Sequence, residues 1–468
     1  MFFIKTFKTF NNYYYYDVNS NSINEISPDL HEKLTDNRLD WYNSKTASEL
    51  ESLINSKRIS MNKSESFLHP FSVVLENFLE RKLSFMSFQL TQNCNLRCKY
   101  CPYTKNDGFN RIHTTLTMTR ETINDALNLL INNSVDNDII TLGFYGGEPL
   151  LEFDLIKYAV NRVKERVEES KIRFTITTNG TLLNQEILEF LDSHRFSIMI
   201  SIDGPKHIND KNRVFHKRNE SVFDIVIKNI MTINENYNEL KSRLGISIVI
   251  DPEVDLYDYE EFFNEYDFLN NTTSNISLID ESHLLERTIR TDSFKKVIGY
   301  KSFLTYLAEL KEIKRGSNDF FNKLIYPNII KKLDGLEFNN QLPKKYAASG
   351  QCIPGNRLFV SVSGNIYPCE KVNELSNYTI MGNVQNGFDL SKSIRILSCS
   401  EKKFEDCKNC FAIRHCTNCI KYFSEMLDNN KNFDINNHCN LVREKVLSDL
   451  IARANLLEAK RKQISASI

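Results

Sequence analysis

The residues of this chain whose spacing most directly indicates chemistry are its cysteines. Three of the eleven, Cys94, Cys98 and Cys101, stand together in the order Cys-x3-Cys-x2-Cys. A [4Fe-4S] cube has one more iron than three thiolates can bind, so one iron would stay open to a small molecule. A structural zinc site needs a closed ligand set, and only His113 follows nearby. The spacing therefore favours an iron–sulfur site with an open position over zinc or over core thiols.

The remaining cysteines lie in the last quarter of the chain and form a second group. An odd total cannot pair completely, and disulfides are rare in the reducing cytosol. We therefore expect a second metal region, either iron–sulfur or a zinc ribbon, since paired Cys-x2-Cys steps are common in zinc sites. The group consists of Cys352, Cys369, Cys399, Cys407, Cys410, Cys416, Cys419 and Cys439.

The composition is that of an ordinary globular protein, and it narrows the range of partners. Of 468 residues 41% are hydrophobic, and 59 basic residues balance 60 acidic ones to give a net charge of −1. Such a chain has no overall basic field to hold nucleic acid. No apolar run is long enough to span a bilayer, and the first residues lack a signal-peptide cleavage site. We expect a cytoplasmic protein that binds neither nucleic acid nor a membrane.

Residues 83–280 alternate between strand-like and helix-like segments. The predicted strands are apolar, β-branched or aromatic runs at 84–90, 139–145, 172–178, 196–202 and 244–250. The predicted helices lie at 119–132, 153–168, 184–194 and 222–234. Repeated βα units imply a parallel sheet, open or barrel-like, with ligands at the carboxyl ends of its strands. The three-cysteine loop directly follows the first strand and so belongs at that edge.

The flanking segments do not follow this alternation. Residues 1–82 begin with short strand-like runs around an Asn/Ser turn, and a charged helical stretch follows at 30–53. Residues 281–345 are charged and mostly helical, as expected of a bridge. Residues 346–445 are rich in cysteine and loops. A closing helix is predicted over 440–461, and residues 446–468 are assigned to it as a C-terminal segment.

The cysteine loop and the motifs at the next strand ends resemble the radical S-adenosylmethionine (SAM) superfamily. Gly146-Gly147-Glu148-Pro149 follows the second strand and resembles the family's GGE motif, which binds the methionine amino group. Two glycines let backbone approach a ligand, and a carboxylate can accept hydrogen bonds from an ammonium group. The resemblance implies a partial (β/α)6 barrel that binds SAM on the open iron and cleaves it to a 5′-deoxyadenosyl radical.

Four further residues match the family's SAM contacts. By similarity Thr177, at the end of the third strand, and Ser201, at the end of the fourth, would face the ribose, although relatives often carry Gln where Thr177 stands. Arg213 matches an arginine that pairs with the SAM carboxylate in some relatives. Tyr100 occupies the aromatic position beside adenine.

The second cysteine group resembles the SPASM extension of radical SAM enzymes, whose cysteines help to hold two auxiliary clusters. The last Cys-x2-Cys step departs from the usual x3 spacing, which puts the ligand order near Cys416 and Cys419 in doubt. The resemblance implies three [4Fe-4S] clusters in all. It assigns Cys407, Cys410, Cys416 and Cys439 to the outer auxiliary cluster and Cys352, Cys369 and Cys419 to the inner one.

The inner set lacks a fourth ligand. Cys399 could complete it or could be a buried thiol. Alternatively the inner cluster stays open and takes a substrate thiolate, since a metal deprotonates the thiol that it binds; we favour the open site. Glu370, directly after Cys369, is a candidate proton acceptor, the alternative being a surface carboxylate.

Residues 1–82 resemble the PqqD-like winged-helix module, which captures a leader peptide as an added strand; a structural cap is the alternative.

The whole layout resembles maturases of ribosomally made peptides, and most closely those that form sactipeptide or ranthipeptide thioethers. The implied partners are a precursor peptide and a reductant such as flavodoxin or ferredoxin. A sulfatase-type formylglycine-generating maturase, a carbon–carbon crosslinking maturase and a non-catalytic iron–sulfur or zinc regulator remain alternatives.

Overall fold

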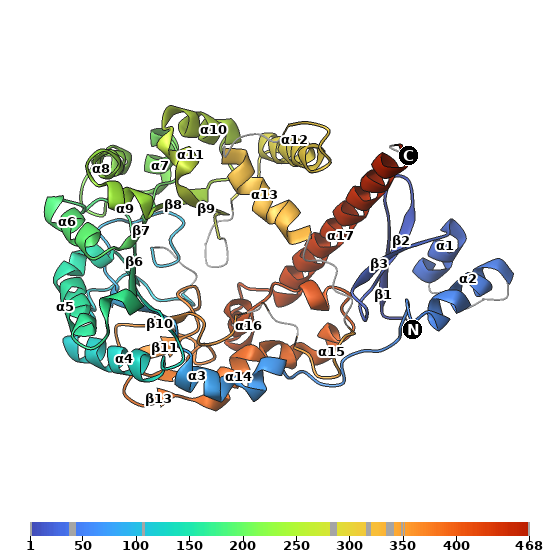
Figure 1. Cartoon of the computed structure of the whole chain (residues 1–468), viewed down its shortest axis with the longest axis horizontal. Helices are drawn as coiled ribbons and strands as arrows, with labels where there is room; N and C mark the ends of the chain where they lie inside the picture. The colour runs from blue at the N-terminus through green and yellow to red at the C-terminus, as the bar shows by residue number, and fades with distance from the viewer. Residues whose placement is uncertain are drawn as a thin grey trace.

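The centre of the molecule is a curved sheet with helices along its outer side (Figure 1). The computed structural model describes residues 2–36, 44–104, 108–280, 288–314, 320–333, 341–347, 350 and 352–466. Six strands pair in parallel and in chain order, as the predicted barrel requires. They are β4 (Phe85–Thr91), β5 (Ile140–Gly146), β6 (Ile172–Thr178), β7 (Ser197–Ser201), β8 (Leu244–Ile250) and β9 (Thr273–Leu278).

Four of the helices between the strands lie where the sequence predicts them, and side chains cap the amino ends of several helices. Thr119 caps α4 by accepting a hydrogen bond from Thr122 N, and Asn184 caps α6 by accepting one from Ile187 N. The covering helices are α4 (Arg120–Asn132), α5 (Phe153–Lys164), α6 (Gln185–Ser193), α7 (Lys206–Asn212), α8 (Val222–Asn236), α9 (Asn238–Ser242), α10 (Leu256–Glu265) and α11 (Phe268–Asn271). The structure thus confirms the α/β partial barrel, although α5 ends before the predicted residue 168.

Strand alternation separates the core from the inner face of the barrel. In β6, Phe174 and Ile176 are buried toward the helices, whereas Thr175 and Thr177 are half-buried on the opposite face. Phe196, just before β7, stacks on Phe174 with ring centroids 5.1 Å apart. The same alternation directs the polar side chains of the other strands inward.

The C-terminal region completes the barrel sheet. Strand β10 (Leu358–Val360) pairs in parallel with β4, and β11 (Asn365–Tyr367), β12 (Gly382–Asn383) and β13 (Gly387–Phe388) extend the sheet antiparallel. Residues 346–445 therefore share a sheet with the barrel. Three helices follow: α14 (Leu390–Leu397), α15 (Phe404–Cys407) and α16 (Ile420–Leu427).

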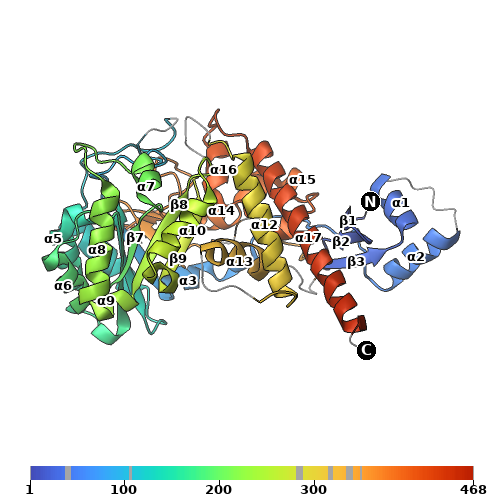
Figure 2. The same cartoon turned by 90° about the horizontal axis from the view of Figure 1, so that it is seen from above.

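The last helix, α17 (Ile435–Ala466), starts earlier than predicted. The expected start at 440 and the segment boundary at 446 are both wrong, because the helix runs through them and carries Cys439 near its beginning. Two helices of the bridge, α12 (Asp292–Glu309) and α13 (Phe320–Leu333), lie between the barrel and α17 (Figure 2). No helix within the described ranges is long and apolar enough to cross a membrane.

The N-terminal residues form a separate small sheet at the far end of α17 (Figure 1). Its strands β1 (Ile4–Lys8), β2 (Tyr13–Asp17) and β3 (Ser22–Ile26) are antiparallel, and α1 (Pro28–Asp36) and α2 (Ser44–Asn55) follow. A 3-10 turn at Pro70–Val73 and helix α3 (Leu75–Arg81) lead from this module into β4.

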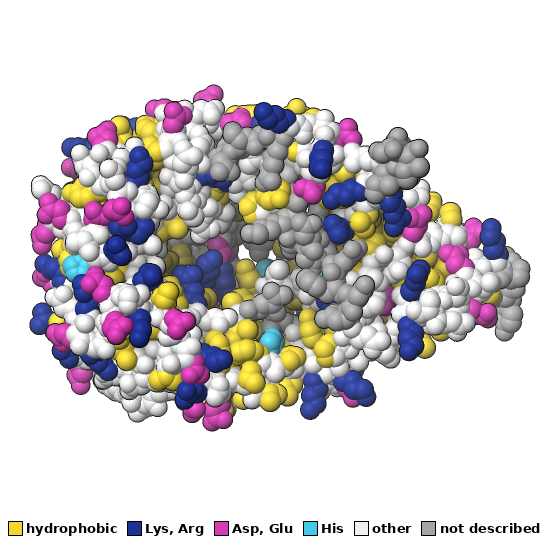
Figure 3. All heavy atoms as spheres, in the orientation of Figure 1, with side chains coloured by type: hydrophobic (Ala, Val, Ile, Leu, Met, Phe, Trp, Pro, Cys, Tyr) yellow, Lys and Arg dark blue, Asp and Glu magenta, His cyan; other side chains and the backbone are white. Residues whose placement is uncertain are grey.

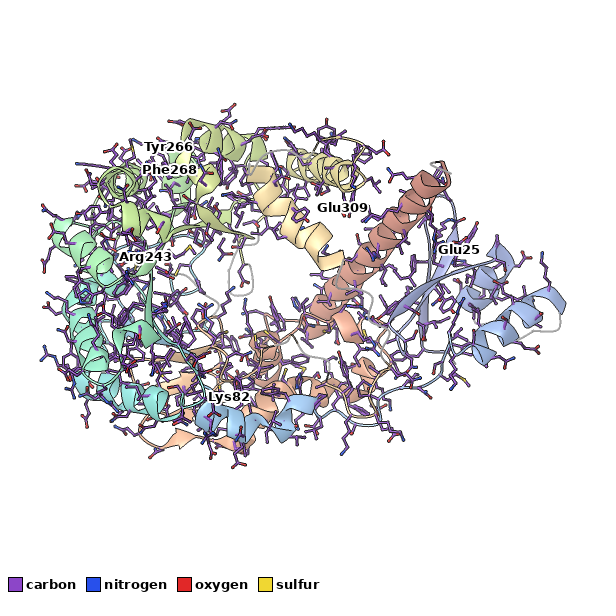
Figure 4. The ribbon with its side chains drawn as sticks, in the orientation of Figure 1. Glu25, Lys82, Arg243, Tyr266, Phe268 and Glu309 are labelled. Atoms are coloured by element: carbon purple, nitrogen blue, oxygen red, sulfur yellow. The ribbon has the colours of Figure 1, made fainter. Side chains whose placement is uncertain are left out.

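Ion pairs hold α17 on both sides. Figure 4 labels Glu25 of the N-terminal sheet and Glu309 of α12, which flank the helix. Arg461 lies 2.9 Å from Glu25, and Lys460 lies 3.5 Å from Glu309. The buried Glu458 also accepts hydrogen bonds from Tyr14 (2.8 Å) and Thr9 (2.5 Å). The N-terminal module is therefore docked on α17 through these polar contacts and through an apolar cluster that includes Phe7, Val446 and Leu450.

Candidate active site

A cavity of about 1030 Å³ occupies the inner side of the barrel. Figure 3 shows a hollow at the corresponding place, with Lys and Arg side chains on its wall. Nine of the predicted SAM-site residues, three of them cysteines, line it together with the candidate acceptor Glu370 and its neighbour Lys371. The predicted residues on the wall that are not cysteines are Tyr100, Gly146, Gly147, Thr177, Ser201, Arg213 and Glu370.

The three cysteines of the first loop all line this cavity. Burial is the largest cause that raises the pKa of Cys94 to about 11 and that of Cys98 to about 12, and the neighbouring thiols are among the smaller causes. Among the described residues, no three His, Cys, Asp or Glu side chains converge closely enough to hold one ion in common. A cube does not require such convergence, because each thiolate binds a different iron. The donor set of the loop, three thiols, fits a cluster that keeps one iron open.

The two glycines at the end of β5 let two segments of the backbone approach each other closely. The sequence predicted an approach of the backbone to a ligand. Gly147 N donates to Thr91 O (2.8 Å) and Glu148 N donates to Asn93 O (2.9 Å). A Cβ on Gly147 would stand 1.9 Å from Asn93 O, so only glycine fits. The motif therefore packs β5 against the backbone that leads into Cys94, and both glycines also border the cavity.

Glu148 is fully buried behind the cavity wall rather than on it. Its carboxylate accepts hydrogen bonds from Leu150 N (3.1 Å), Thr178 Oγ1 (2.7 Å) and Asn179 N (2.7 Å). Burial raises its pKa, and these hydrogen bonds oppose the rise. Through these hydrogen bonds Glu148 links the end of β5 to the end of β6. Its contact with the ammonium group of a ligand remains a prediction.

Tyr100 and Arg213 meet at a buried carboxylate that the sequence did not single out. The Tyr100 hydroxyl donates to Asp203, and Arg213 Nη1 donates to that hydroxyl at 2.8 Å. Asp203 Oδ2 lies 3.7 Å from Arg213 Nη1, and Asp203 Oδ1 accepts from Val249 N (3.1 Å). Asp203 stands in a Ser-x-Asp-Gly-Pro turn after β7, where an acidic residue usually signals only a turn.

The Arg213 guanidinium keeps capacity for an anion. Burial alone would lower its pKa, but Tyr100, Cys98 and Asp203 raise it well above the usual value, so the group stays charged. Its Nε is buried and has no hydrogen-bond partner among the described residues. A buried cationic donor without a partner on a cavity wall suits the carboxylate of a ligand such as SAM.

Asn179 is a further site residue that sequence reasoning left without a role. Its Nδ2 donates to Asn95 Oδ1 (2.8 Å) and approaches Cys94 Sγ at 3.9 Å. Its Oδ1 accepts from Thr181 N (3.0 Å). The sequence held a signal for this residue, because Asn179 stands before a glycine directly after a predicted strand. In the structure this glycine has φ +75° at the carboxyl end of β6.

A second cavity, of about 470 Å³, lies at the start of α17. The four cysteines assigned to the outer auxiliary cluster line it. Burial raises the pKa of Cys407 to about 12 and that of Cys416 to about 11, with nearby thiols adding to both shifts. The structure therefore brings Cys407, Cys410, Cys416 and Cys439 around one space, as the resemblance implies.

The three cysteines assigned to the inner cluster are also neighbours. The thiols of Cys352 and Cys419 both act on the pKa of Cys369, which burial raises to about 12. Gly350 N donates to Asn418 O, and a Cβ at Gly350 would stand 3.0 Å from the Cβ of Cys419. The backbone before Cys352 thus packs directly on the Cys419 loop.

Cys399 is 3% exposed and belongs to the hydrophobic core. Burial raises the pKa of its thiol well above the usual value, and Cys419 of the inner set and Cys416 and Cys407 of the outer set raise the pKa as well. This position agrees with either alternative for Cys399, so its role stays a prediction.

Glu370 lies in the wall of the large cavity, not on the outer surface. Its side chain is 11% exposed and pairs with Arg357 at 3.2 Å, while Oε2 has no hydrogen-bond partner among the described residues. The carboxylate next to Cys369 therefore borders the same space as Cys101.

The comparisons with known proteins agree with this geometry. Residues 88–265 match the radical SAM superfamily. An uncharacterized protein of Methanocaldococcus jannaschii is 29% identical over 69% of this chain and 96% of its own length. The cysteine-type anaerobic sulfatase-maturating enzyme of Clostridium novyi is 26% identical over 62% of this chain and 74% of its own length.

Solved structures show the same fold. Native anSMEcpe with bound AdoMet aligns with a TM-score of 0.57 and 22% identity, over 80% of this chain and 99% of that chain. The same enzyme with AdoMet and the Kp18Cys peptide aligns with a TM-score of 0.52 and 20% identity, over 73% of this chain and 90% of that chain.

The barrel of this chain thus resembles a radical SAM domain over residues 88–265, which run from β4 to α10. In this family, SAM bound to a cysteine-held [4Fe-4S] cluster supplies a 5′-deoxyadenosyl radical. Cys94, Cys98 and Cys101 could hold such a cluster, and Arg213, whose Nε has no hydrogen-bond partner in the described part of the chain, could bind the carboxylate of SAM.

Proposed function

We propose that this protein is a radical SAM maturase of a ribosomally synthesised peptide. In this reaction a hydrogen is abstracted from an acceptor residue, and a cysteine of the same peptide forms a thioether at that carbon. The observation that carries the proposal is the shared cavity, which is bordered on one side by Cys94, Cys98 and Cys101 and on another by Glu370, next to Cys369. One substrate could therefore contact both sites at once.

The proposed reaction balances as the removal of two hydrogens from the peptide for each new carbon–sulfur bond. One would leave as a hydrogen atom to the adenosyl radical that bound SAM would supply, and the other as the thiol proton. The auxiliary clusters that the two C-terminal cysteine sets would hold would supply the acceptor for the surplus electron. In this proposal Glu370 accepts the thiol proton; its carboxylate borders the cavity and pairs with Arg357 at 3.2 Å. The Tyr100–Asp203–Arg213 group orients the cofactor, and the cofactors supply the difficult chemistry.

Two observations support a peptide substrate. The curated relatives include enzymes that mature sulfatases, which are themselves polypeptides. In the N-terminal sheet, β3 pairs only with β2 among the described residues, which leaves an edge at which a leader peptide could add as a strand. Arg414, between Cys410 and Cys416, donates to Val18 O and Asn19 O (2.6 Å each), so this module contacts the loop of the outer cysteine set.

The second candidate is a sulfatase-type maturase that forms formylglycine, and the similarity to cysteine-type sulfatase-maturating enzymes favours it. A carbon–carbon crosslinking maturase is the third. The number of protein ligands to the inner cluster separates the first two, because an open iron is needed only if a substrate thiolate binds there.

The test is co-expression without air with a short cysteine-containing peptide encoded beside this gene, followed by mass spectrometry. A thioether removes two hydrogens and leaves no thiol that iodoacetamide can alkylate. Formylglycine removes the sulfur, and a carbon–carbon bond leaves any cysteine alkylatable, so either result would contradict the proposal. Absence of 5′-deoxyadenosine with SAM and dithionite would contradict radical chemistry altogether.

A further inference from the structure

The large cavity has a predominantly basic wall. Dark blue Lys and Arg side chains are visible in the hollow of Figure 3. Among the residues that the structure describes, five Arg or Lys side chains line the cavity, against two carboxylates. Three of the basic groups are paired with other acids: Arg213 with Asp203, Arg243 with Asp192 and Lys421 with Asp280. The two that remain, Arg357 and Lys371, lie beside the second carboxylate of the wall, Glu370.

Arg357 keeps most of its hydrogen-bonding capacity. Its Nη2 lies 3.2 Å from Glu370 Oε1, and its Cζ lies 5.0 Å from the ring centroid of Phe85. The side chain is 55% exposed, and in the described part of the chain no second carboxylate lies within ion-pair distance of it. A guanidinium carries five N–H donors in a planar fork that matches a carboxylate. Arg357 can therefore hold Glu370 and bind a second anion at the same time.

Lys371 and Glu370 add an unused donor and an unused acceptor at the same place. Lys371 directly follows Glu370 and lines the cavity with an exposed side chain, and none of the described carboxylates lies within ion-pair distance of its ammonium group. Oε2 of Glu370 is buried and has no hydrogen-bond partner within the described ranges. Because buried acceptors normally have a partner, a ligand of this subsite should carry both an anion and a hydrogen-bond donor.

This subsite lies away from the predicted SAM site. Arg357 directly precedes β10, which runs parallel to β4, and it lies over Phe85, the first residue of β4. The first cysteine loop instead follows Thr91, the last residue of β4. The seven residues of this strand put its two ends about 20 Å apart. The SAM carboxylate, assigned to Arg213, therefore belongs at the other end of the strand from the anion that Arg357 and Lys371 would bind.

We propose that Arg357 and Lys371 bind a side-chain carboxylate of the substrate peptide, so that the enzyme selects a core segment with Asp or Glu close to the modified cysteine. The inference rests on the proposed function, in which the cysteine thiol meets Glu370. The thiol supplies the donor that Glu370 Oε2 lacks, and the neighbouring carboxylate supplies the anion. In an extended peptide, side chains two positions apart lie on the same face at about 7 Å, so one peptide can present both groups to this wall.

The test measures binding by the reconstituted holoenzyme with SAM, without air and without reductant. The probes are two fluorescein-labelled hexapeptides that contain one cysteine and differ only in an Asp or an Asn two residues after it, and fluorescence anisotropy gives each Kd. The variant is Arg357→Gln/Lys371→Gln. The matched control is Arg81→Gln/Lys82→Gln, because Arg81 is 49% exposed and paired with Asp136 at 2.8 Å, Lys82 is exposed, and neither lines the cavity.

We expect the parent protein and the control to bind the Asp peptide about tenfold more tightly than the Asn peptide at low salt, and this ratio to shrink as salt screens the charges. In the Arg357/Lys371 variant the ratio should fall close to one. Equal affinity of the parent for the two peptides, no measurable binding of either, or the same ratio in the variant would overturn the proposed subsite.

Iron analysis of the same samples separates this role from support of the nearby cysteines. The variant should keep the iron content of the parent, and a loss of iron would overturn the proposal, because the two cations would then serve the cysteine set. Dithionite added to the parent with the Asp peptide tests the proposed function separately. Preferential binding without formation of 5′-deoxyadenosine or a thioether would contradict the proposed function and leave the carboxylate subsite standing.

Discussion

The guanidinium of Arg111 lies 2.6 Å from the carboxylate of Glu374, and each side chain is only 5% exposed. Arg111 also stacks on Tyr103, with its Cζ 3.5 Å from the ring centroid, and Gln89 of β4 donates to the same Glu374 oxygen at 2.7 Å. Arg111 follows the first cysteine loop, whereas Glu374 follows Cys369. This buried pair therefore fixes the SAM-site loop against the segment that carries the inner cysteines.

Removal of one member of the Arg111–Glu374 pair should strongly lower the free energy of unfolding. Arg111→Gln or Glu374→Gln leaves a buried group without its charged partner, which typically costs about 3–5 kcal/mol. The double substitution should cost less than the sum of the two. Urea unfolding of the anaerobic protein measures this, with Arg81→Gln at an exposed ion pair with Asp136 as the control that changes little. Additive losses would show that the two residues act separately.

Gly147→Ala should disrupt the first cysteine loop, since its Cβ would collide with Asn93 O. We expect the purified protein to lose about one cluster's worth of iron and sulfide while the auxiliary sites stay filled. Gly299→Ala in α12 is the matched control, because nothing lies within 4 Å of its Cβ and alanine favours a helix by up to about 1 kcal/mol. Full iron content in the Gly147 variant would contradict this role for the glycine.

An open inner cluster predicts different results for two neighbouring cysteines. Cys399→Ala should keep the full iron content, because Cys399 would be only a core thiol, whereas Cys369→Ala should lose the inner cluster. Iron analysis and electron paramagnetic resonance of anaerobic samples measure both. Loss of a cluster in the Cys399 variant would favour the fully ligated site, and with it the sulfatase-type chemistry.

Docking of the N-terminal module should weaken in acid. Burial would raise the pKa of Glu458, but hydrogen bonds from Thr9, Asn11 and Tyr14 outweigh it and leave the pKa below the usual 4.5. Because the folded pKa is depressed, the stabilisation is complete above about pH 4.5 and is lost as the pH falls toward the folded value. Urea unfolding at pH 6 and pH 4 measures the loss, and Glu458→Gln should remove this part of the pH dependence. If the free energy of unfolding of the Glu458→Gln variant fell between pH 6 and pH 4 as much as that of the parent protein, Glu458 would not be the source of this pH dependence.

The sequence predicted most strands of the barrel because they are continuous apolar runs, as buried parallel strands are. Strand β9 was not recognised, since four of the six residues of TSNISL are polar and the strand is largely exposed. The positions of the cysteine sets followed from spacing and resemblance. The contacts between distant residues did not, because Arg111 and Glu374 are 263 residues apart and neither stands in a motif. Asp203 was missed for a similar reason, since only the fold shows that this turn residue is buried beneath Tyr100.

The parallel pairing of β10 with β4 has a consequence for how the molecule is made. Until ribosomes have translated the last quarter of the gene, the first barrel strand presents a bare row of amide and carbonyl groups along one border. Chaperone protection and iron loading in the cell should therefore come late, after the whole polypeptide has emerged, and a nonsense mutation before β10 should yield an insoluble, colourless product.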